Sequence, residues 1–332
     1  PGFPGVQGTL TIITPELGEN FSILPLKYNT DLNQIIQINR LLSPSQIYVG
    51  SELIIPINNK ANPLIPVAIF QETSTFLETS ALLDLNPQSL ALMNQVTNSN
   101  LVVPKSIIFA VSSAESNVID LFAPDLQAVT LSPLPLFQGA TEVISVKSDQ
   151  VLKLSGSLNG IQLNFFSETP GEYFSLQGIY AVADPGLSEF TLTANFPDGS
   201  IHTYTQPVLL KSANFDIDPP LTVDPNTVDP DITGPENDFV KSVVSKITPQ
   251  RYWSEQFSTP AFFQEYNSLF GTRRTYNGDP TVTFHGGVDF AGGITLPILA
   301  PAPGKVVFAG PLTVRGNAVF IDHGYGVFSG FF

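Results

Sequence analysis

A histidine and an aspartate four residues apart are the side chains of this sequence best suited to bind a metal. His285 and Asp289 lie in the stretch TVTFHGGVDFAGG, and the chain has only three histidines. Zinc binds imidazole nitrogen and carboxylate oxygen at about 2 Å. On a straight strand the two side chains would lie roughly 13 Å apart, and Gly286-Gly287 disfavours a helix. A tight turn through these glycines is the remaining way to bring both onto one ion. The spacing permits a metal site without proving one.

The composition limits the kinds of protein that could carry this pair. The 332 residues have a net charge of -15, 42% hydrophobic and 13% charged residues, and no cysteine. This length and apolar content indicate a globular protein of several domains. The missing cysteine excludes disulfides and zinc–thiolate sites. The acidic balance argues against a nucleic-acid partner, since phosphates attract lysine and arginine. No apolar run approaches the roughly 18 residues of a membrane helix.

An internal repeat opens the chain. The segments 21–39 and 76–94 both begin with Phe and end with Asn, at an offset of 55 residues. Asp31 and Asn86 are placed to cap a helix in each copy, and a short apolar strand follows. The pattern predicts two strand–helix–helix–strand modules, over 8–58 and 65–112.

The first copy resembles a LysM module. Gly18-Glu19 stands before the first helix, Asn39 ends the second, and Gly50, Leu53 and Pro56 close the unit. The second copy departs from this pattern, with Gln71-Glu72 in place of Gly-Glu and Lys105 in place of the glycine.

The LysM resemblance implies a ligand. Modules of this family generally bind glycans that contain N-acetylglucosamine, such as peptidoglycan or chitin. It places the groove at the loops that follow Gly18 and Asn39, with Gly18, Glu19 and Asn39 as glycan-binding candidates. The alternative is that the modules keep the fold and have lost the ligand.

The middle of the chain reads as β structure followed by a spacer. Alternating strands over 124–215 are separated by turn signals such as Asn159-Gly160, which predicts an antiparallel sandwich of immunoglobulin-like type. Residues 216–238 are acidic, Pro-rich and aperiodic, which predicts an extended linker. Val240, Val243, Val244 and Ile247 then share one face of an expected helix.

The region that holds His285 and Asp289 resembles the lysostaphin-type (LytM-like) zinc endopeptidases. The resemblance covers 270–332 and is carried by SLFGTRR, HGGVDFAG, PILAPAPGKVVFAG and GNAVFIDHGYGV. It implies that 239–332 is part of an antiparallel-β peptidase domain in which His285 and Asp289 bind zinc. The family's third ligand lies in a later His-x-His, and its catalytic histidines lie there and in a Tyr-x-His-Leu segment. This chain contains neither motif, so it holds no candidate catalytic residue.

Three further residues near the pair have structural interpretations. His323 reads as a turn histidine beside Asp322, with a substitute metal ligand as the alternative. Arg273 and Arg274 are expected to pack or pair at the domain face, with binding of a substrate carboxylate as the alternative.

The sequence therefore predicts a multidomain, mainly β protein with small α+β modules, located outside the cell or in the envelope of a bacterium. The resemblances imply a zinc-dependent peptidoglycan endopeptidase. We expect both ends of the given sequence to be cut, since it starts at Pro1 without an initiator Met and a strand-like run reaches Phe332. We expect this segment to bind zinc weakly or not at all. The alternative is a non-catalytic scaffold, surface-filament or activator subunit that binds peptidoglycan or other envelope proteins. The residues encoded after Phe332 distinguish the two.

Overall fold

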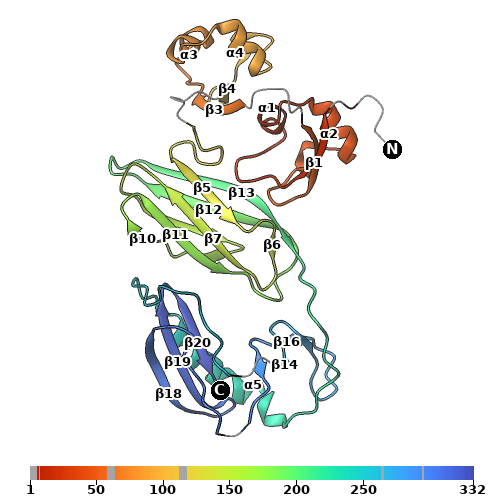
Figure 1. The fold of residues 1–332 in the computed structure, drawn as a ribbon, viewed down its shortest axis with the longest axis vertical. Coiled ribbons are helices and arrows are strands. Elements are labelled where there is room, and N and C mark those ends of the chain that lie inside the picture. Colours follow the sequence, from red (N-terminus) through yellow and green to blue (C-terminus); the bar gives the residue numbers. More distant parts are fainter. Residues whose placement is uncertain (1–5, 7, 58–63, 112–117, 263–264, 294) are drawn as a thin grey trace. The chain divides into compact units, whose positions relative to one another are not determined.

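The computed structural model describes residues 6, 8–57, 64–111, 118–262, 265–293 and 295–332 (Figure 1). The chain forms two compact units. The first comprises Pro1–Ile179 with Asp184–Lys211, and the second comprises Tyr180–Ala183 with Ser212–Phe332. Strands predominate in both, which confirms the multidomain, mainly β fold class. The described part of the chain holds no helix with the length and apolar character that crossing a bilayer requires.

The two repeats of the first unit have the same order of elements. The first consists of β1 (Thr9–Ile13), α1 (Leu24–Lys27), α2 (Leu32–Asn39), the 3-10 turn η1 (Pro44–Gln46) and β2 (Leu53–Ile57). The second consists of β3 (Leu64–Ile69), α3 (Phe76–Leu82), α4 (Pro87–Met93), η2 (Ser99–Leu101) and β4 (Ile107–Val111). In each repeat the two strands pair antiparallel. Asp31 and Asn86 cap α2 and α4 as predicted.

One asparagine in each repeat ties the second helix to the last strand. The Asn39 amide donates to Ile35 O at 2.9 Å and to Ile54 O at 2.7 Å, and Ile54 N donates to Asn39 Oδ1 at 2.8 Å. Asn94 makes the same three bonds, at 2.9, 2.8 and 2.7 Å, with residues 55 positions further along. We call this arrangement the asparagine clamp. It satisfies backbone groups that would otherwise be left unpaired inside the module.

Backbone conformation follows the same offset. Residues with a positive φ are uncommon outside glycine, yet they recur in register in the two repeats. The equivalent pairs are Asn29 and Asp84 (46° and 51°), Arg40 and Gln95 (53° and 54°), and Gly50 and Lys105 (85° and 68°). The second copy therefore keeps the fold of the first, although Lys105 stands where the first copy has glycine.

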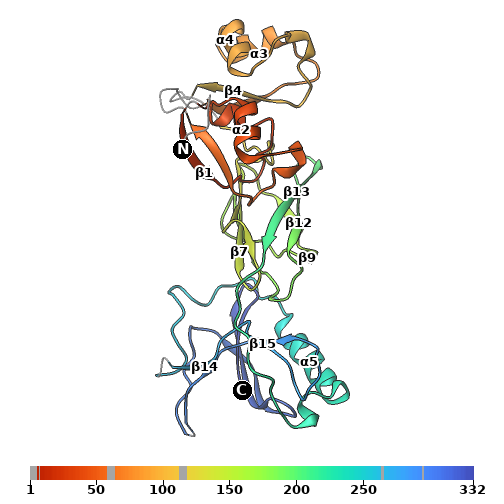
Figure 2. The same ribbon diagram turned by 90° about the vertical axis from the view of Figure 1, so that its right-hand side faces the viewer.

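Residues 128–211 form a sandwich of two sheets, which Figure 2 shows with β7 in one and β12 in the other. The first sheet has the order β10 (Phe166–Thr169), β11 (Glu172–Gly178), β7 (Thr141–Lys147) and β5 (Ala128–Ser132). The second has the order β6 (Leu136–Phe137), β13 (Ile201–Lys211), β12 (Gly186–Asn195), β8 (Lys153–Leu158) and β9 (Ile161–Gln162). Asn159 and Gly160 have φ values of 52° and 75°, as a tight β8–β9 hairpin requires. The sandwich departs from the predicted antiparallel pairing at one edge, where β6 pairs parallel with β13.

The first repeat packs against this sandwich through its loops. Val49 is fully buried and forms a parallel bridge with Val208, and Leu209 N donates to Val49 O at 2.8 Å. Gly18 N donates to Gln206 Oε1 at 2.7 Å. A Cβ atom at Gly18 would lie 2.2 Å from the Leu121 backbone, so glycine is needed at this contact.

The second unit contains a helix and several small sheets. They are η3 (Pro225–Thr227), α5 (Pro230–Val244), the pairs β14 (Tyr266–Ser268) with β17 (Asp289–Phe290) and β15 (Arg273–Arg274) with β16 (Thr283–Phe284), and the hairpin sheet β18 (Lys305–Leu312), β19 (Gly316–Gly324) and β20 (Val327–Phe331).

The prediction of an extended linker over 216–238 is wrong in two respects. Helix α5 begins at Pro230, with the Asp229 side chain accepting from Asp231 N, and it continues through Pro235. Before it, Ile217 and Leu221 form parallel bridges with Arg273 and Tyr276. The sequence did not predict this helix because its buried residue is polar, so the segment shows no apolar periodicity. The Glu236 carboxylate accepts from Val314 N at 2.7 Å and from the Arg315 side chain at 2.7 Å. The segment is thus part of the second unit.

Candidate functional site

The structure brings His285 and Asp289 together. They lie at the two ends of the connection between β16 and β17, and His285 Nε2 is 3.2 Å from Asp289 Oδ1. The backbone of His285 is fixed on both sides, since His285 N donates to Thr272 O at 2.9 Å and Gly271 N donates to His285 O at 2.8 Å. The turn that the spacing required is therefore present.

The other nitrogen of His285 indicates which ring nitrogen is available. His285 Nδ1 lies 3.1 Å from Leu269 O and 3.2 Å from Ser268 Oγ. A carbonyl oxygen can only accept, so Nδ1 carries the proton that it donates. In the neutral ring Nε2 then has a lone pair, and it faces a carboxylate oxygen. Two acceptors at 3.2 Å need a cation between them, either a proton or a metal ion.

The glycines do not have the role that the sequence suggested. Neither Gly286 nor Gly287 has a positive φ, and a Cβ atom at Gly286 would meet nothing within 4 Å. The chain turns here without the conformational freedom of glycine. A Cβ at Gly287 would lie 3.9 Å from His285 Nε2, so small residues leave the space beside the ring open.

The two arginines pair as expected. Arg274 donates to Asp218 Oδ2 at 2.8 Å, donates to Ser268 Oγ, and lies 3.4 Å from Asp289 Oδ2. It holds the carboxylate by the oxygen that His285 does not face. Arg273 donates to Ala181 O at 2.7 Å and lies over the ring of Phe215. The Arg274 guanidinium is thus already bound to acidic and hydroxyl groups of this unit.

The pair fits two positions of a zinc site. Two ligands bound tetrahedrally at about 2.0–2.2 Å lie roughly 3.3 Å apart, close to the 3.2 Å seen here. A ring nitrogen that donates to a backbone carbonyl is the usual support of a metal-bound histidine. Within the described residues no cluster of three or more His, Cys, Asp or Glu side chains exists. The geometry of His285 and Asp289 is therefore compatible with two positions of a zinc site, and the described residues offer no third ligand beside them.

His323 belongs to the core of the hairpin sheet. It is fully buried in β19, with Nδ1 2.8 Å from Pro303 O and Nε2 2.8 Å from Ser329 Oγ. Both ring nitrogens are thereby occupied. His323 was expected in a turn, and it lies instead near the end of strand β19. Its two hydrogen bonds agree with the expected structural role.

The glycan-binding candidates of the first repeat are separated by the structure. Glu19 is buried and pairs with Lys27, and Asn39 forms the clamp inside the module. Both side chains are engaged in holding the fold. Gly18 alone lines a cavity, where its backbone approaches the 121–122 segment closely.

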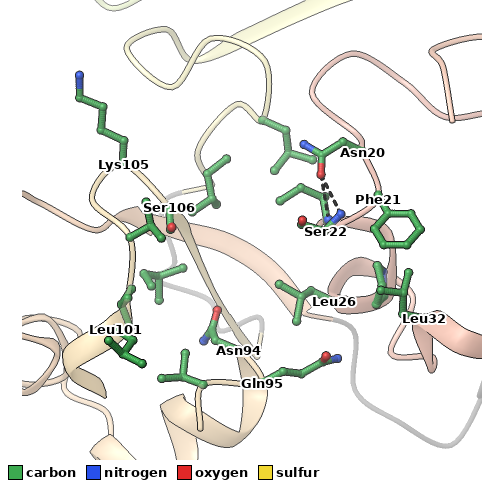
Figure 3. A pocket seen from close by; sticks show the side chains of 18 of the residues that line it. Asn20, Phe21, Ser22, Leu26, Leu32, Asn94, Gln95, Leu101, Lys105 and Ser106 are labelled. Carbon is green, nitrogen blue, oxygen red and sulfur yellow. Dashed lines mark hydrogen bonds between the residues drawn. The ribbon is translucent and has the colours of Figure 1, made fainter. Parts of the chain in front are cut away.

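That cavity has a volume of about 640 Å³ and is lined by both repeats (Figure 3). One wall is the β1–α1 loop and helix α1 of the first repeat, with Ser22 from the loop and Leu26 from the helix. The other is the α4–β4 connection of the second, with Gln95, Thr97 and Ser106. Sequence reasoning did not identify this site, because each repeat was considered separately. The short spacing between the two modules was the one feature of the sequence that could have indicated a site shared by both.

Two segments match known families. Residues 17–56 match the LysM domain, and residues 283–332 match peptidase family M23. The chain thus carries a LysM domain and a segment of the M23 peptidase family, the combination that its motifs indicated. The M23 match includes His285, Asp289 and His323.

Solved structures give weaker likenesses. A crystal structure assigned to peptidase M23 from Pseudomonas aeruginosa shares 22% identity at a TM-score of 0.40, over 59% of this chain and 72% of that one. The spore cortex-lytic enzyme SleL of Bacillus megaterium shares 21% at 0.19, over 40% of this chain and 26% of that one. Neither score reaches 0.5, so these alignments do not bear on the domain arrangement. None of the curated proteins compared with the chain matches it.

Proposed function

We propose that this chain is part of an exported, zinc-dependent endopeptidase that cuts peptidoglycan peptides and is held on its substrate by LysM modules. The observation that carries the proposal is the pairing of His285 Nε2 with Asp289 Oδ1 at 3.2 Å, inside the segment that matches family M23. Peptidoglycan would be the glycan partner, in the cell envelope or outside the cell.

His285 and Asp289 would hold the metal. Zinc in such a site polarises a peptide carbonyl and lowers the pKa of bound water. Neighbouring residues of this chain orient the two side chains for binding the metal. Leu269 O orders the His285 tautomer, and Arg274 orients the Asp289 carboxylate. No step of peptide cleavage is assigned to these residues, because the family's catalytic histidine motifs are not among them.

Zinc titration followed by NMR of the three histidines tests the metal site. We expect zinc to shift the His285 imidazole resonances with low affinity, far from the roughly 10–16 kcal/mol of a complete structural site. The Asp289→Asn variant should abolish the shift. His323 is the internal control, since both its nitrogens are occupied. Tight stoichiometric binding would contradict the partial ligand set, and an unchanged response in Asp289→Asn would contradict the pair.

A non-catalytic envelope scaffold is the second candidate. It is favoured by the incomplete ligand set among the described residues. Incubation of purified peptidoglycan with the chain separates binding from cleavage. Sedimentation with the glycan without release of soluble peptides is expected for this chain, and release of peptides would refute that expectation.

A further inference from the structure

One of the two loops that form the expected groove of the first repeat is anchored at its end. In the resemblance, each module binds glycan between its two loops, which here are the β1–α1 loop and the α2–β2 connection. The end of the α2–β2 connection is fixed on the sandwich, where Val49 bridges Val208 and Glu52 pairs with Lys211 at 3.2 Å. A Cβ atom at Gly50 would lie 3.0 Å from Pro135. The end of this loop is therefore held in place by the sandwich.

The β1–α1 loop of the first repeat faces the second repeat instead. A buried apolar cluster joins the modules, with Ile23 from the first and Leu64 and Phe109 from the second. Such a cluster fixes two small modules against each other. Ile23 also lines the cavity, so the joint that holds the modules forms part of its wall.

The lining has the mixed chemistry that an N-acetylated sugar requires. Ser22 and Thr97 carry hydroxyls and Gln95 an amide, groups that can donate to and accept from sugar hydroxyls and an acetamide. Leu26 and Leu101 supply apolar surface for the sugar ring and the acetyl methyl, and Leu101 is 74% exposed. Figure 3 shows Leu26, Gln95 and Leu101 around the same hollow. The volume of about 640 Å³ lies in the range of roughly 300–1,000 Å³ that is usual for small ligands.

We propose that the two modules form one composite site for N-acetylglucosamine-containing glycan, built from the first loop of one repeat and the second loop of the other. The proposal rests on the glycan-binding function proposed above. It differs from that function in predicting one shared site where two separate grooves are expected.

The repeat itself provides matched variants. Ser22 and Thr97 are exposed and line the cavity from opposite modules. The equivalent positions 55 residues away, Leu77 and Leu42, are 65% and 92% exposed and do not line it. Tryptophan at each of the four positions places the same bulk on either the composite site or a single-module groove.

Calorimetric titration of the full chain and its variants with a soluble N-acetylglucosamine pentamer is the test. We expect Ser22→Trp and Thr97→Trp each to weaken binding by about tenfold or more, a loss of ~1.4 kcal/mol. Leu42→Trp and Leu77→Trp should bind as the parent does. Circular dichroism with thermal melting identifies any variant that fails to fold. Because Ser22→Trp and Thr97→Trp probe opposite walls of the cavity, the loss of one variant still leaves the other to test the proposal.

The other patterns overturn the proposal. Loss in Ser22→Trp and Leu42→Trp alone would place the ligand in the first module's own groove. Loss in Thr97→Trp and Leu77→Trp alone would place it in the second. If the parent chain binds neither the pentamer nor purified peptidoglycan, the proposed glycan-binding function fails as well.

Discussion

A buried glutamate in the sandwich makes its stability depend on pH. Alternate residues of β7 point into the core, and Glu142 occupies one of these positions together with Ile144 and Val146. Its side chain is fully buried, and neither carboxylate oxygen has a hydrogen-bond partner among the described residues. Burial without a partner disfavours the charged form, and it raises the pKa of Glu142 from 4.5 to about 7.

The size of the effect follows from linkage. Between pH 4.5 and about 7 the unfolded chain loses this proton while the folded chain keeps it. The free energy of unfolding therefore falls as pH rises through this window, at ~1.4 kcal/mol per pH unit. Below the window the group has no effect. Above the window the free energy of unfolding has fallen by its full amount, about 3 kcal/mol. For a domain of this size that corresponds to a fall of more than about 10 °C in melting temperature.

Differential scanning calorimetry of the full chain at pH 5 and pH 8.5 measures this loss. The Glu142→Gln variant cannot ionise, so the transition of its sandwich should move little between the two pH values and should lie above the parent at pH 8.5. Glu189→Gln, an exposed change on β12, should leave the pH dependence of the parent intact. A parent transition that does not respond to pH, or a Glu142→Gln transition that falls as the parent does, would refute the reasoning.

Two further substitutions test the fold. Asn39→Ala should lower the free energy of unfolding of its module by about 2–3 kcal/mol in denaturant titrations, because it leaves partly buried backbone groups of the clamp unpaired. Asn94→Ala should lower the free energy of unfolding of the second module by the same amount. A near-neutral result in either variant would contradict the clamp. Gly304→Ala should destabilise the hairpin sheet by ~1–3 kcal/mol, since its Cβ would lie 2.7 Å from Asp322 O. The comparison is Gly278→Ala, an exposed change in the second unit. Gly278 has a positive φ and no neighbour within 4 Å of an added Cβ, so this variant reports backbone strain without steric crowding.

Local signals in the sequence predicted local structure well. The caps at Asp31 and Asn86 and the Asn159-Gly160 hairpin each depend on neighbouring residues, and all are present. The turn between His285 and Asp289 is also present, although it does not use the conformational freedom of the glycines that suggested it. The repeat was visible because its offset never changes. These features need little information from the rest of the chain.

Features set by distant partners were missed. Helix α5 begins early because Glu236 finds donors at Val314 and Arg315, a contact that no local pattern reveals. Glu142 lies in a stretch whose alternation predicts a strand, but a charged residue gives no indication that it points to the buried face of that strand. The cavity needs two modules placed side by side. Glu19, a candidate for glycan binding, is buried and pairs with Lys27, a contact that its own position in the sequence does not reveal.

The asparagine clamp also bears on how a duplicated sequence avoids pairing with itself during folding. Each clamp closes a loop of 15 residues. A wrong clamp from Asn39 to Phe109 would close about 70 residues, at an added entropic cost of roughly 1.4 kcal/mol from the logarithmic dependence on loop length. Local closure is also faster than distant closure. Each module can thus complete its own clamp first, which protects the tandem from exchanging strands between its copies.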